Sequence, residues 1–323
     1  MIKFLKITGI VLLVLLILVG GFLIFWFFGD KYDEFYKSSK KEFEIAGLDD
    51  GFTPQGICYS SSDNIFLTSG YMKDGGASRI YVVNKTTQET IKYFTLKKNG
   101  EDYNGHAGGI ATNGVNVWVA GDKIVHTFSY ADIANVQDKG FINITASFEP
   151  KNGADFLTVK NNQLWIGEFH KSGAYDTDQT HEITTASGDK NQAISFCFNI
   201  DNTTLGFNTT PVKALSTPSQ VQGMVITNDS IVLSTSYSLP ASHIYKYENV
   251  LNSTTDKTFD YSGNNIPLYV LDKANIEKDL VTPSMSEEIE IVDGRIYILF
   301  ENACQKYRLF TREKLTNVYS IEL

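Results

Sequence analysis

Acidic residues stand out as candidates for catalysis because of where they fall in a repeated sequence phrase. Asp155 and Glu288 occupy a position that is glycine in three similar phrases, and Glu287 directly precedes Glu288. An unpaired buried carboxylate costs several kcal/mol, so acids at such positions need a cation, an arginine or water as a partner. Two carboxylates about 5–9.5 Å apart on either side of a bond can hydrolyse a glycoside. The catalytic candidates are Asp155, Glu168, Glu287 and Glu288.

A second group carries amide, imidazole, phenol, carboxylate and amine side chains, which bind ligands through hydrogen bonds and ring contacts. His106 precedes two glycines and could act as a ligand or base, or could bond to neighbouring backbone. Gln55 and Gln222 could equally bridge neighbouring sheets. The binding candidates are Gln55, Tyr71, His106, His170, Tyr175, His181, Gln222, Tyr237, Glu301 and Lys306.

The segment from Glu168 to His181 is the richest polar loop, and it holds two of the five histidines. Loops this long are often functional. Imidazole and carboxylate groups can hold a divalent cation, and the carboxylates suit Ca²⁺, although these residues show no fixed ligand spacing. The loop is consistent either with a divalent-cation site or with a solvated, hydrogen-bonded lid, and the identity of any metal or cofactor stays open.

A recurring phrase predicts the elements that position these residues. In each copy a polar or glycine pair enters an apolar strand, a turn follows, and a second apolar strand ends in a small or acidic residue. The phrases begin at Gln55-Gly56-Ile57, Gly108-Gly109-Ile110, Ala154-Asp155-Phe156, Gln222-Gly223-Met224 and Glu287-Glu288-Ile289. Self-similarity at such a period indicates a repeat architecture, and short strands bounded by Asn, Asp, Gly and Ser indicate hairpins.

The fold class predicted from these repeats is an all-β, five-bladed β-propeller, with four antiparallel strands in each blade. A sixth blade between His170 and Pro218 is the alternative, although no sixth phrase is found there. We expect a strand near Phe43 to pair with residues 317–322 and close the ring. In a propeller, the entries to the first strands and the loops between second and third strands open on one face. The candidate residues should therefore gather around one polar pocket.

Residues 7–28 contain no charged side chain, unlike the rest of the chain. As a helix they would span roughly 33 Å, enough to cross a bilayer. Lys3 and Lys6 before this segment place the N-terminus in the cytoplasm. The alternative is a cleaved signal peptide, whose apolar region is usually shorter. We therefore expect a cytoplasmic segment at 1–6, a single-pass signal anchor at 7–28, a stalk at 29–41 and an extracellular propeller at 42–323.

The charge of the chain argues against binding to nucleic acid. The net charge is −9, and it becomes −11 when the two lysines of the N-terminal segment are set aside. A domain this acidic would be repelled by phosphate backbones. The chain has only three cysteines. Cys58 and Cys197 lie in apolar strand patterns, so we expect buried free thiols.

The first blade resembles the opening of the plant-type glutaminyl cyclases, a family of five-bladed propellers that begins F-T-Q-G-L. The residues that carry the resemblance are Phe52-Thr53-Pro54-Gln55-Gly56-Ile57, then Ser69-Gly70 and Ser78-Arg79-Ile80-Tyr81. This chain inserts Pro54, and it has Gly108 and Thr68 where the family has acids. The resemblance implies the propeller fold, and these departures leave the cyclase activity unsupported. More loosely, the entry phrases are similar to those of strictosidine-synthase-like and NHL propellers.

Two functions fit these observations. The first is a binding module, an anchored extracytoplasmic propeller that captures a small ligand, a glycan or a partner protein on its channel face. The second is a glycosidase-like hydrolase that uses paired carboxylates at the propeller axis. The sequence has no G-x-S-x-G, H-E-x-x-H or phosphate-loop motif that would name another chemistry.

Overall fold

The computed structural model describes residues 10–21 and 32–322. It divides the chain into two compact units, Met1–Asp33 and Glu34–Leu323. In the first unit, residues 10–21 form an α-helix with exposed apolar side chains. Across the described residues we find no helix with the length and apolar character of a membrane span. The remainder of the expected anchor, residues 7–9 and 22–28, lies outside the described residues.

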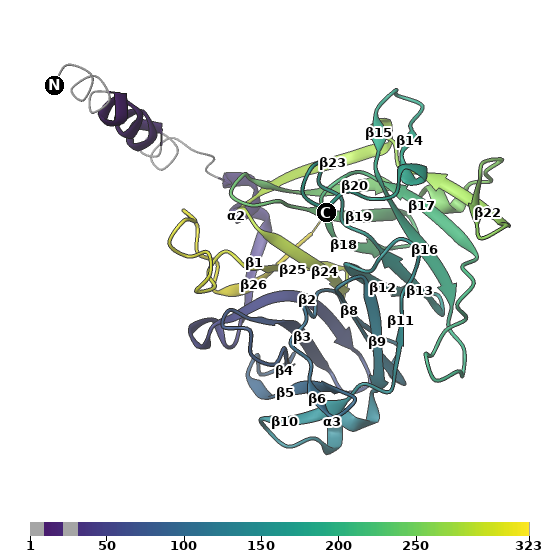
Figure 1. The fold of residues 1–323 in the computed structure, drawn as a ribbon, viewed down its shortest axis with the longest axis horizontal. Helices are drawn as coiled ribbons and strands as arrows, with labels where there is room; N and C mark the ends of the chain where they lie inside the picture. The colour runs from purple at the N-terminus through teal and green to yellow at the C-terminus, as the bar shows by residue number, and fades with distance from the viewer. Residues whose placement is uncertain (1–9, 22–31, 323) are drawn as a thin grey trace. The chain divides into compact units, whose positions relative to one another are not determined.

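The second unit, described over residues 34–322, is a five-bladed β-propeller (Figure 1). The four strands of each blade, from the axis outward, are as follows. Blade 1 has β2 (Phe52–Ser60), β3 (Ile65–Met72), β4 (Arg79–Asn84) and β5 (Thr90–Lys98); blade 2 has β7 (Ile110–Thr112), β8 (Asn116–Gly121), β9 (Ile124–Ser129) and β11 (Ala146–Phe148); blade 3 has β12 (Phe156–Lys160), β13 (Gln163–Gly167), β16 (Ala193–Asn199) and β17 (Lys213–Thr217). Blade 4 has β18 (Val221–Ile226), β19 (Ser230–Thr235), β20 (Ser242–Glu248) and β23 (Ile276–Thr282); blade 5 has β24 (Ser286–Val292), β25 (Arg295–Phe300), β26 (Asn317–Ile321) and β1 (Ser39–Glu44).

The inner strands contact one another in a closed ring, in the order β24, β2, β7, β12, β18 and back to β24. This ring confirms the predicted five blades. The segment between His170 and Pro218, where a sixth blade was the alternative, supplies β16 and β17 of blade 3 and a small hairpin. That hairpin consists of β14 (Ile183–Thr184) and β15 (Lys190–Asn191).

Two blades are widened by strands that the repeat pattern did not predict. β10 (Gly140–Asn143) pairs parallel with β5 of blade 1, and β6 (Glu101–Asp102) pairs with the same strand. In blade 3, β22 (Asn264–Val270) pairs parallel with β17 and forms a hairpin with β21 (Thr258–Tyr261). A segment inserted in one blade thus extends the neighbouring sheet and covers its edge.

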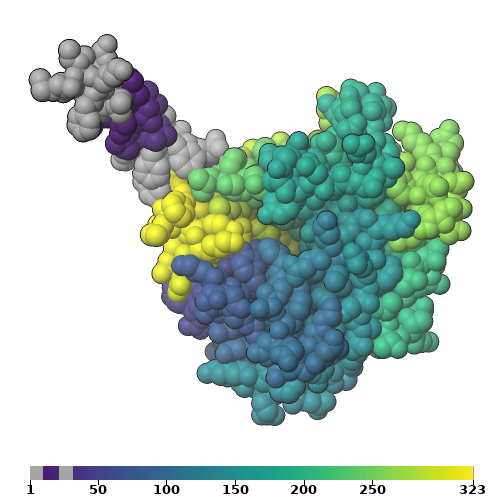
Figure 2. Space-filling view, viewed as in Figure 1, coloured from purple at the N-terminus to yellow at the C-terminus, as the bar shows by residue number. Residues whose placement is uncertain are grey.

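The ring is closed by the predicted pairing between the first and last strands. β1 lies antiparallel to β26, with Ser39 opposite Ile321 and Glu44 opposite Asn317. The C-terminal part of the propeller accordingly adjoins its first blade at the surface (Figure 2). Residues 33–38 of the expected stalk form a short helix, α2 (Asp33–Ser38). Its Phe35 is fully buried, and its ring centroid lies 5.8 Å from that of Phe300.

The hydrophobic core lies between adjacent blades. Strands buried on both faces carry continuous apolar runs, and every residue of β19 is buried. Trp118 of blade 2 packs against blade 3, and its indole N–H donates to the carbonyl of Leu205 at 2.7 Å. Cys58, Cys197 and Cys304 are all buried and free, which confirms the prediction of buried thiols for Cys58 and Cys197.

Glu288 lies where the inner strands meet, and it is fully buried. Its Oε2 accepts hydrogen bonds from the backbone N–H of Ile57 at 2.9 Å and of Ile110 at 2.8 Å, and its Oε1 accepts one from Leu157 at 3.0 Å. These donors belong to blades 1, 2 and 3, whereas Glu288 belongs to blade 5. A single carboxyl group therefore joins the inner strands of four blades.

The glycines of the entry phrases are required by the close approach of the inner strands, as the sequence suggested. A Cβ at Gly109 would come within 2.6 Å of Glu288 Oε1 and of the Cα of Phe156. A Cβ at Gly223 would lie 2.7 Å from the Cα of Glu288. These distances are too short for any side chain, because the obstructing atoms include backbone.

We predict that Glu288→Gln lowers the free energy of unfolding by about 1–3 kcal/mol. The glutamine amide presents N–H groups toward backbone donors, so at least one buried N–H loses its acceptor. Urea unfolding of the purified protein measures the loss. Glu277→Gln on the outer strand β23, with an exposed side chain, is the matched control and should change stability by about 0.5 kcal/mol or less. Equal stability of Glu288→Gln and wild type would contradict this role.

Candidate functional site

Irregular strand register directs polar side chains from three inner strands toward the open face of the channel. The register shifts between Pro54 and Gly56 in β2, between Val221 and Gly223 in β18, and between Ser286 and Ile289 in β24. The residues within these three shifts are Gln55, Gln222 and the pair Glu287 and Glu288. A β-bulge re-aims one side chain and is frequent beside active sites. The repeated phrases that identified the blades are therefore also the points where the strands bend.

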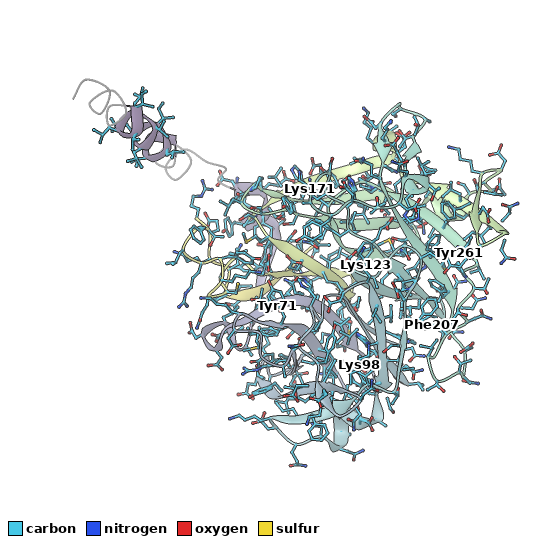
Figure 3. All side chains as sticks on the ribbon, viewed as in Figure 1. Tyr71, Lys98, Lys123, Lys171, Phe207 and Tyr261 are labelled. Atoms are coloured by element: carbon cyan, nitrogen blue, oxygen red, sulfur yellow. The ribbon has the colours of Figure 1, made fainter. Side chains whose placement is uncertain are left out.

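A cavity of about 610 Å³ opens at this face, and residues from all five blades line it. Ten candidates from the sequence lie together there: Gln55, Tyr71, His106, Asp155, Tyr175, Gln222, Tyr237, Glu287, Glu301 and Lys306. Figure 3 labels Tyr71 of blade 1 and Lys123 of blade 2, both of which line the cavity. The fold thus gathers residues that are more than 200 positions apart in the sequence.

Several apolar or aromatic lining residues could not be predicted from residue type alone, because such side chains are as common in the core as in a ligand site. These include Phe169, Met285, Tyr307 and Phe310. The repeat pattern could have predicted two of them, because Phe169 and Tyr307 directly follow the candidates Glu168 and Lys306 in the sequence.

Four candidates do not line the cavity. Glu288 holds the inner strands, as described above. Glu168 is buried, and its Oε1 lies 2.7 Å from Nδ1 of His181 and accepts the Ile194 N–H at 2.8 Å. The Nδ1 of His170 lies 2.8 Å from the hydroxyl of Ser219. These contacts fasten the long loop of blade 3 to its surroundings, which favours a structural role for the pair Glu168 and His181.

Metal binding in this loop gains no support from the geometry. Among residues 10–21 and 32–322, we find no group of three or more His, Cys, Asp or Glu side chains placed to hold a metal ion. The predicted divalent-cation site stays a prediction.

A chain of hydrogen bonds leads from His106 to two carboxyl groups. The Nε2 of His106 lies 2.5 Å from Oε1 of Gln55, and Nε2 of Gln55 donates to Glu301 at 2.8 Å. The same amide nitrogen donates to the carbonyl of Pro54 at 2.8 Å, which fixes the amide orientation. Because Gln55 presents its oxygen to His106, the histidine proton is on Nε2.

Glu287 and Glu301 are hydrogen-bonded to each other through their carboxyl groups. Burial raises the pKa of Glu301 to about 7, against the opposing effect of the nearby Lys306 ammonium. Burial and the Glu301 carboxylate together raise the pKa of Glu287 well above its ordinary value. Two carboxyl groups this close cannot both ionise readily, so they share a proton at neutral pH.

Asp155, in blade 3, is a third acid that lines the cavity. Protein encloses it on most sides, yet its side chain is open to the cavity. Its Oδ2 accepts the backbone N–H of Phe169 at 2.7 Å. Enclosure in the protein raises the pKa of Asp155 to about 6, although the N–H of Phe169 and the charge of Lys123 favour ionisation.

Tyrosine rings hold the lysine at the rim. Lys306 Nζ donates to the hydroxyl of Tyr71 at 2.5 Å and lies 4.8 Å from that ring centroid and 4.9 Å from that of Tyr307. The ring of Tyr71 also lies 4.7 Å from the imidazole of His106. Burial and the charge of Glu301 raise the pKa of Tyr71, so it is a neutral phenol.

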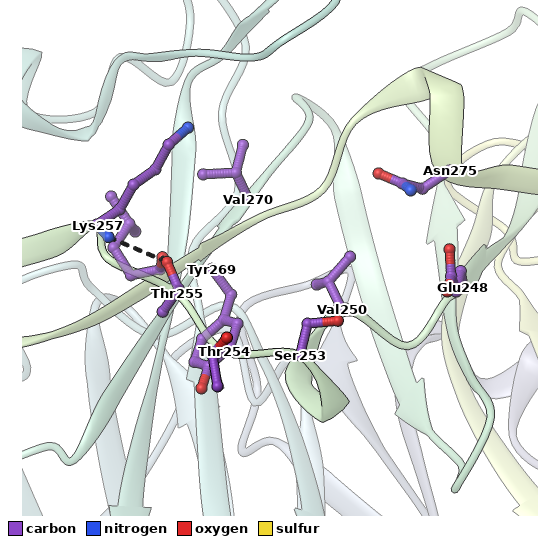
Figure 4. Close-up of a pocket in the computed structure, with 10 residues that line it drawn as sticks. Glu248, Val250, Ser253, Thr254, Thr255, Lys257, Tyr269, Val270 and Asn275 are labelled. Carbon is purple, nitrogen blue, oxygen red and sulfur yellow. Dashed lines mark hydrogen bonds between the residues drawn. The ribbon is translucent and has the colours of Figure 1, made fainter.

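A second hollow of about 240 Å³ lies elsewhere, between β20 and the inserted strand β22 (Figure 4). The backbone N–H of Lys257 donates to the hydroxyl of Thr255 at 3.1 Å within it. Only Glu248 and Lys257 among its lining residues are charged. Because it has neither converging acids nor histidines, it is a weaker candidate than the channel cavity.

No family model and no curated protein matches the sequence. Among solved structures, the chain is similar to the glutaminyl cyclase of Myxococcus xanthus, with 11% identity and a TM-score of 0.46 over 87% of this chain and 94% of that one. It is also similar to a tail fiber of Staphylococcus aureus phage P68, with 10% identity and a TM-score of 0.45 over 93% of this chain and 55% of that one. A nidogen/laminin complex gives 8% identity and a TM-score of 0.39 over 78% of this chain and 74% of that one. No activity or ligand is carried over at these values.

The buried acid pair gives a testable dependence of stability on pH. Glu301 has a pKa of about 7 in the folded protein and an ordinary value near 4.3 when unfolded. Between these values the folded state binds more protons, so the contribution of the pair to stability falls as pH rises. We predict that the stability of wild type relative to Glu301→Gln declines from pH 4.5 to pH 7, the range over which Glu301 ionises in the folded protein.

Urea unfolding at a series of pH values measures this difference. The control is Glu101→Gln, whose side chain is exposed in the folded protein and should give a difference that hardly changes with pH. A difference between wild type and Glu301→Gln that rises with pH would show that the carboxyl pair is ionised in the folded state.

Proposed function

We propose that this protein is a binding module that captures a small organic molecule or a glycan in the channel cavity. The observation that carries the proposal is the convergence of side chains from all five blades on one space of about 610 Å³. Ligand sites are typically concave, of this size, and lined by apolar and aromatic groups with a few fixed polar ones. A partner protein that inserts a side chain into the same cavity is a variant of this proposal.

The polar groups of the cavity are held in place before any ligand arrives. Gln55 is fixed by two acceptors and contacts His106, and Lys306 is fixed by Tyr71. Asp155 keeps one oxygen bonded to the backbone and the other without a hydrogen bond within residues 32–322. Such preorganisation lowers the entropy cost of binding.

A hydrolase is the second candidate, and the geometry narrows its acids to Asp155 and Glu287. Both line the cavity, and both have a raised pKa caused by burial. Glu287 and Glu301 are hydrogen-bonded to each other, too close for the separation of about 5–9.5 Å that glycoside hydrolysis requires. Glu168 and Glu288 are committed to other contacts. The pair Asp155 and Glu287 therefore stays as a catalytic prediction.

We predict that full-length protein binds members of a panel of small organic molecules and oligosaccharides, detected by ligand-observed NMR and by a rise in melting temperature. Leu239→Trp, at the cavity wall, should weaken binding by occupying part of the space with a bulkier ring. Val115→Trp, an exposed position in a hairpin turn of blade 2 that does not line the cavity, is the matched control and should bind as wild type does.

Equal binding by wild type and Leu239→Trp would place the ligand outside the cavity, and no binding by any member of the panel would count against the proposal. The same incubations can be analysed for cleaved oligosaccharide. Turnover that disappears in Asp155→Asn would favour the hydrolase over the binding module.

We also propose that residues 7–28 anchor the protein in the cell membrane, with the N-terminus in the cytoplasm and the propeller outside. The support comes from the sequence, an uncharged segment of spanning length preceded by Lys3 and Lys6. The ligand would then be met on the extracytoplasmic side.

The location can be tested by labelling a single introduced cysteine. Because the three native cysteines are buried, a membrane-impermeant maleimide should leave the folded wild type unlabelled. We predict that Ser62→Cys, at an exposed turn, is labelled in intact spheroplasts of a bacterial host. Ile2→Cys keeps both lysines, so it is the topological control and should be labelled only after lysis. Labelling of Ser62→Cys only after lysis would contradict the proposed topology.

A further inference from the structure

The charges around the cavity are unbalanced. Four carboxyl groups line it, those of Asp122, Asp155, Glu287 and Glu301, against two ammonium groups, those of Lys123 and Lys306. Because Glu287 and Glu301 share a proton, the acids carry about three negative charges against two positive ones. Within residues 32–322, none of the four acids is in an ion pair with a lysine or arginine. Glu287 is 3% exposed, and its carboxyl group bonds only to another carboxyl group in this part of the chain. The cavity therefore presents acceptors that lack a cationic partner.

Asp155 is the acid best placed to receive a donor from a ligand. Its Oδ2 is held by the N–H of Phe169 at 2.7 Å, and its Oδ1 has no hydrogen-bond partner among the described residues. Its side chain is exposed to the cavity. A donor that enters the cavity therefore meets a carboxylate oxygen whose position is already fixed by the backbone.

Three aromatic residues line the same cavity as Asp155, and we call Phe169, Tyr175 and Tyr237 the aromatic wall. The ring centroid of Phe169 lies 5.5 Å from that of Tyr175 and 6.2 Å from that of Tyr237. All three residues line the cavity. Because Phe169 also donates its N–H to Asp155, one residue of the aromatic wall contacts the carboxylate through its backbone.

The rings of this face already attract ammonium groups. The Nζ of Lys171 lies 5.1 Å from the ring centroid of Tyr237, and Figure 3 labels this lysine. Lys306 lies over Tyr71 and Tyr307 in the same way. Aromatic faces hold cations within about 6 Å through the charge distribution of the ring. The wall can therefore contribute to the binding of a cation as well as of an apolar group.

We propose that the cavity takes an organic cation, a protonated amine attached to an apolar or aromatic body, with the amine on Asp155 and the body against the aromatic wall. This inference rests on the proposed binding function and names the class of its ligand. A neutral sugar carries no positive charge to balance the excess of carboxylates. An ammonium group brings a positive charge, and its N–H groups can donate hydrogen bonds to Asp155. Aromatic contact adds to the affinity without a further charge.

A matched pair of probes tests the inference on the wild-type, full-length protein. The probes are 2-phenylethylamine, which is protonated at pH 7.5, and 2-phenylethanol, which has the same body and no charge. Isothermal titration calorimetry and saturation-transfer NMR measure their binding. We expect the amine to bind at least tenfold more tightly than the alcohol.

Variants assign this preference to the two parts of the site. Asp155→Asn should remove the preference for the amine while leaving the weak affinity for the alcohol, and Tyr237→Leu should weaken both probes. Asp74→Asn is the matched control, since Asp74 is also an exposed aspartate that accepts one backbone N–H, at 3.0 Å, but lies outside the cavity. It should bind as wild type does.

Equal affinities of wild type for the two probes would overturn the inference and leave the proposed binding function standing. A preference for the amine that persists in Asp155→Asn, with the variant shown to be folded by its melting transition, would also overturn it. If neither probe binds and the broader panel also fails, the proposed function itself is wrong. If only the panel binds, the function stands and the cationic class is wrong.

Discussion

The hydrogen bonds of one buried carboxyl group hold the centre of this propeller together. Glu288 accepts N–H groups from Ile57, Ile110 and Leu157, which belong to three other blades. Strands that line a propeller axis cannot bond to one another as a sheet does, so their inward N–H groups need another acceptor. A side chain with two oxygens supplies several acceptor positions at one point. The close approach that this requires explains why a Cβ at Gly109 or Gly223 would collide with Glu288.

The same strand positions create the cavity. Register shifts in β2, β18 and β24 leave Gln55, Gln222 and Glu287 aimed at the open face. Burying these acids costs electrostatic free energy, because a buried carboxylate loses its hydration. Burial accordingly raises the pKa of Glu287 and brings that of Glu301 to about 7. Groups that are held at such a cost are candidates for function, since a structure with no ligand to bind could replace them with apolar residues.

The repeat phrases carried most of the fold prediction. They identified the five blades because each inner strand starts with the same polar or glycine pair, and the closing pair β1 and β26 followed from the need to complete a ring. Asp155, Glu301 and Lys306 could be predicted to share one pocket, because the strands of a propeller fix the positions of its loops. The inserted strands β10 and β22 escaped prediction, since they pair with a neighbouring blade rather than with their own repeat.

Some side chains could not be assigned from sequence because their direction depends on contacts with other blades. Glu287 and Glu288 are adjacent and chemically alike, yet the bulge in β24 gives one to the cavity and the other to the backbones of three blades. Glu168 and His181 looked like site residues, but each satisfies the other inside the loop of blade 3. Which acid is structural depends on the N–H donors that lie within hydrogen-bond distance of it. Those donors are known only once the blades are packed together.

The most direct test of this account is native-state hydrogen exchange of the Ile57, Ile110 and Leu157 amides, resolved by NMR, in wild type and Glu288→Gln. If one carboxyl group binds all three N–H groups, these amides exchange slowly in wild type. Glutamine keeps one of the two oxygens, so the variant should lose protection either at Leu157 alone or at Ile57 and Ile110 together, since these two share Oε2 although they lie in different blades. Unchanged protection at all three amides, or a loss at only one of Ile57 and Ile110, would show that the inner strands are held by other contacts and would contradict the central role of Glu288.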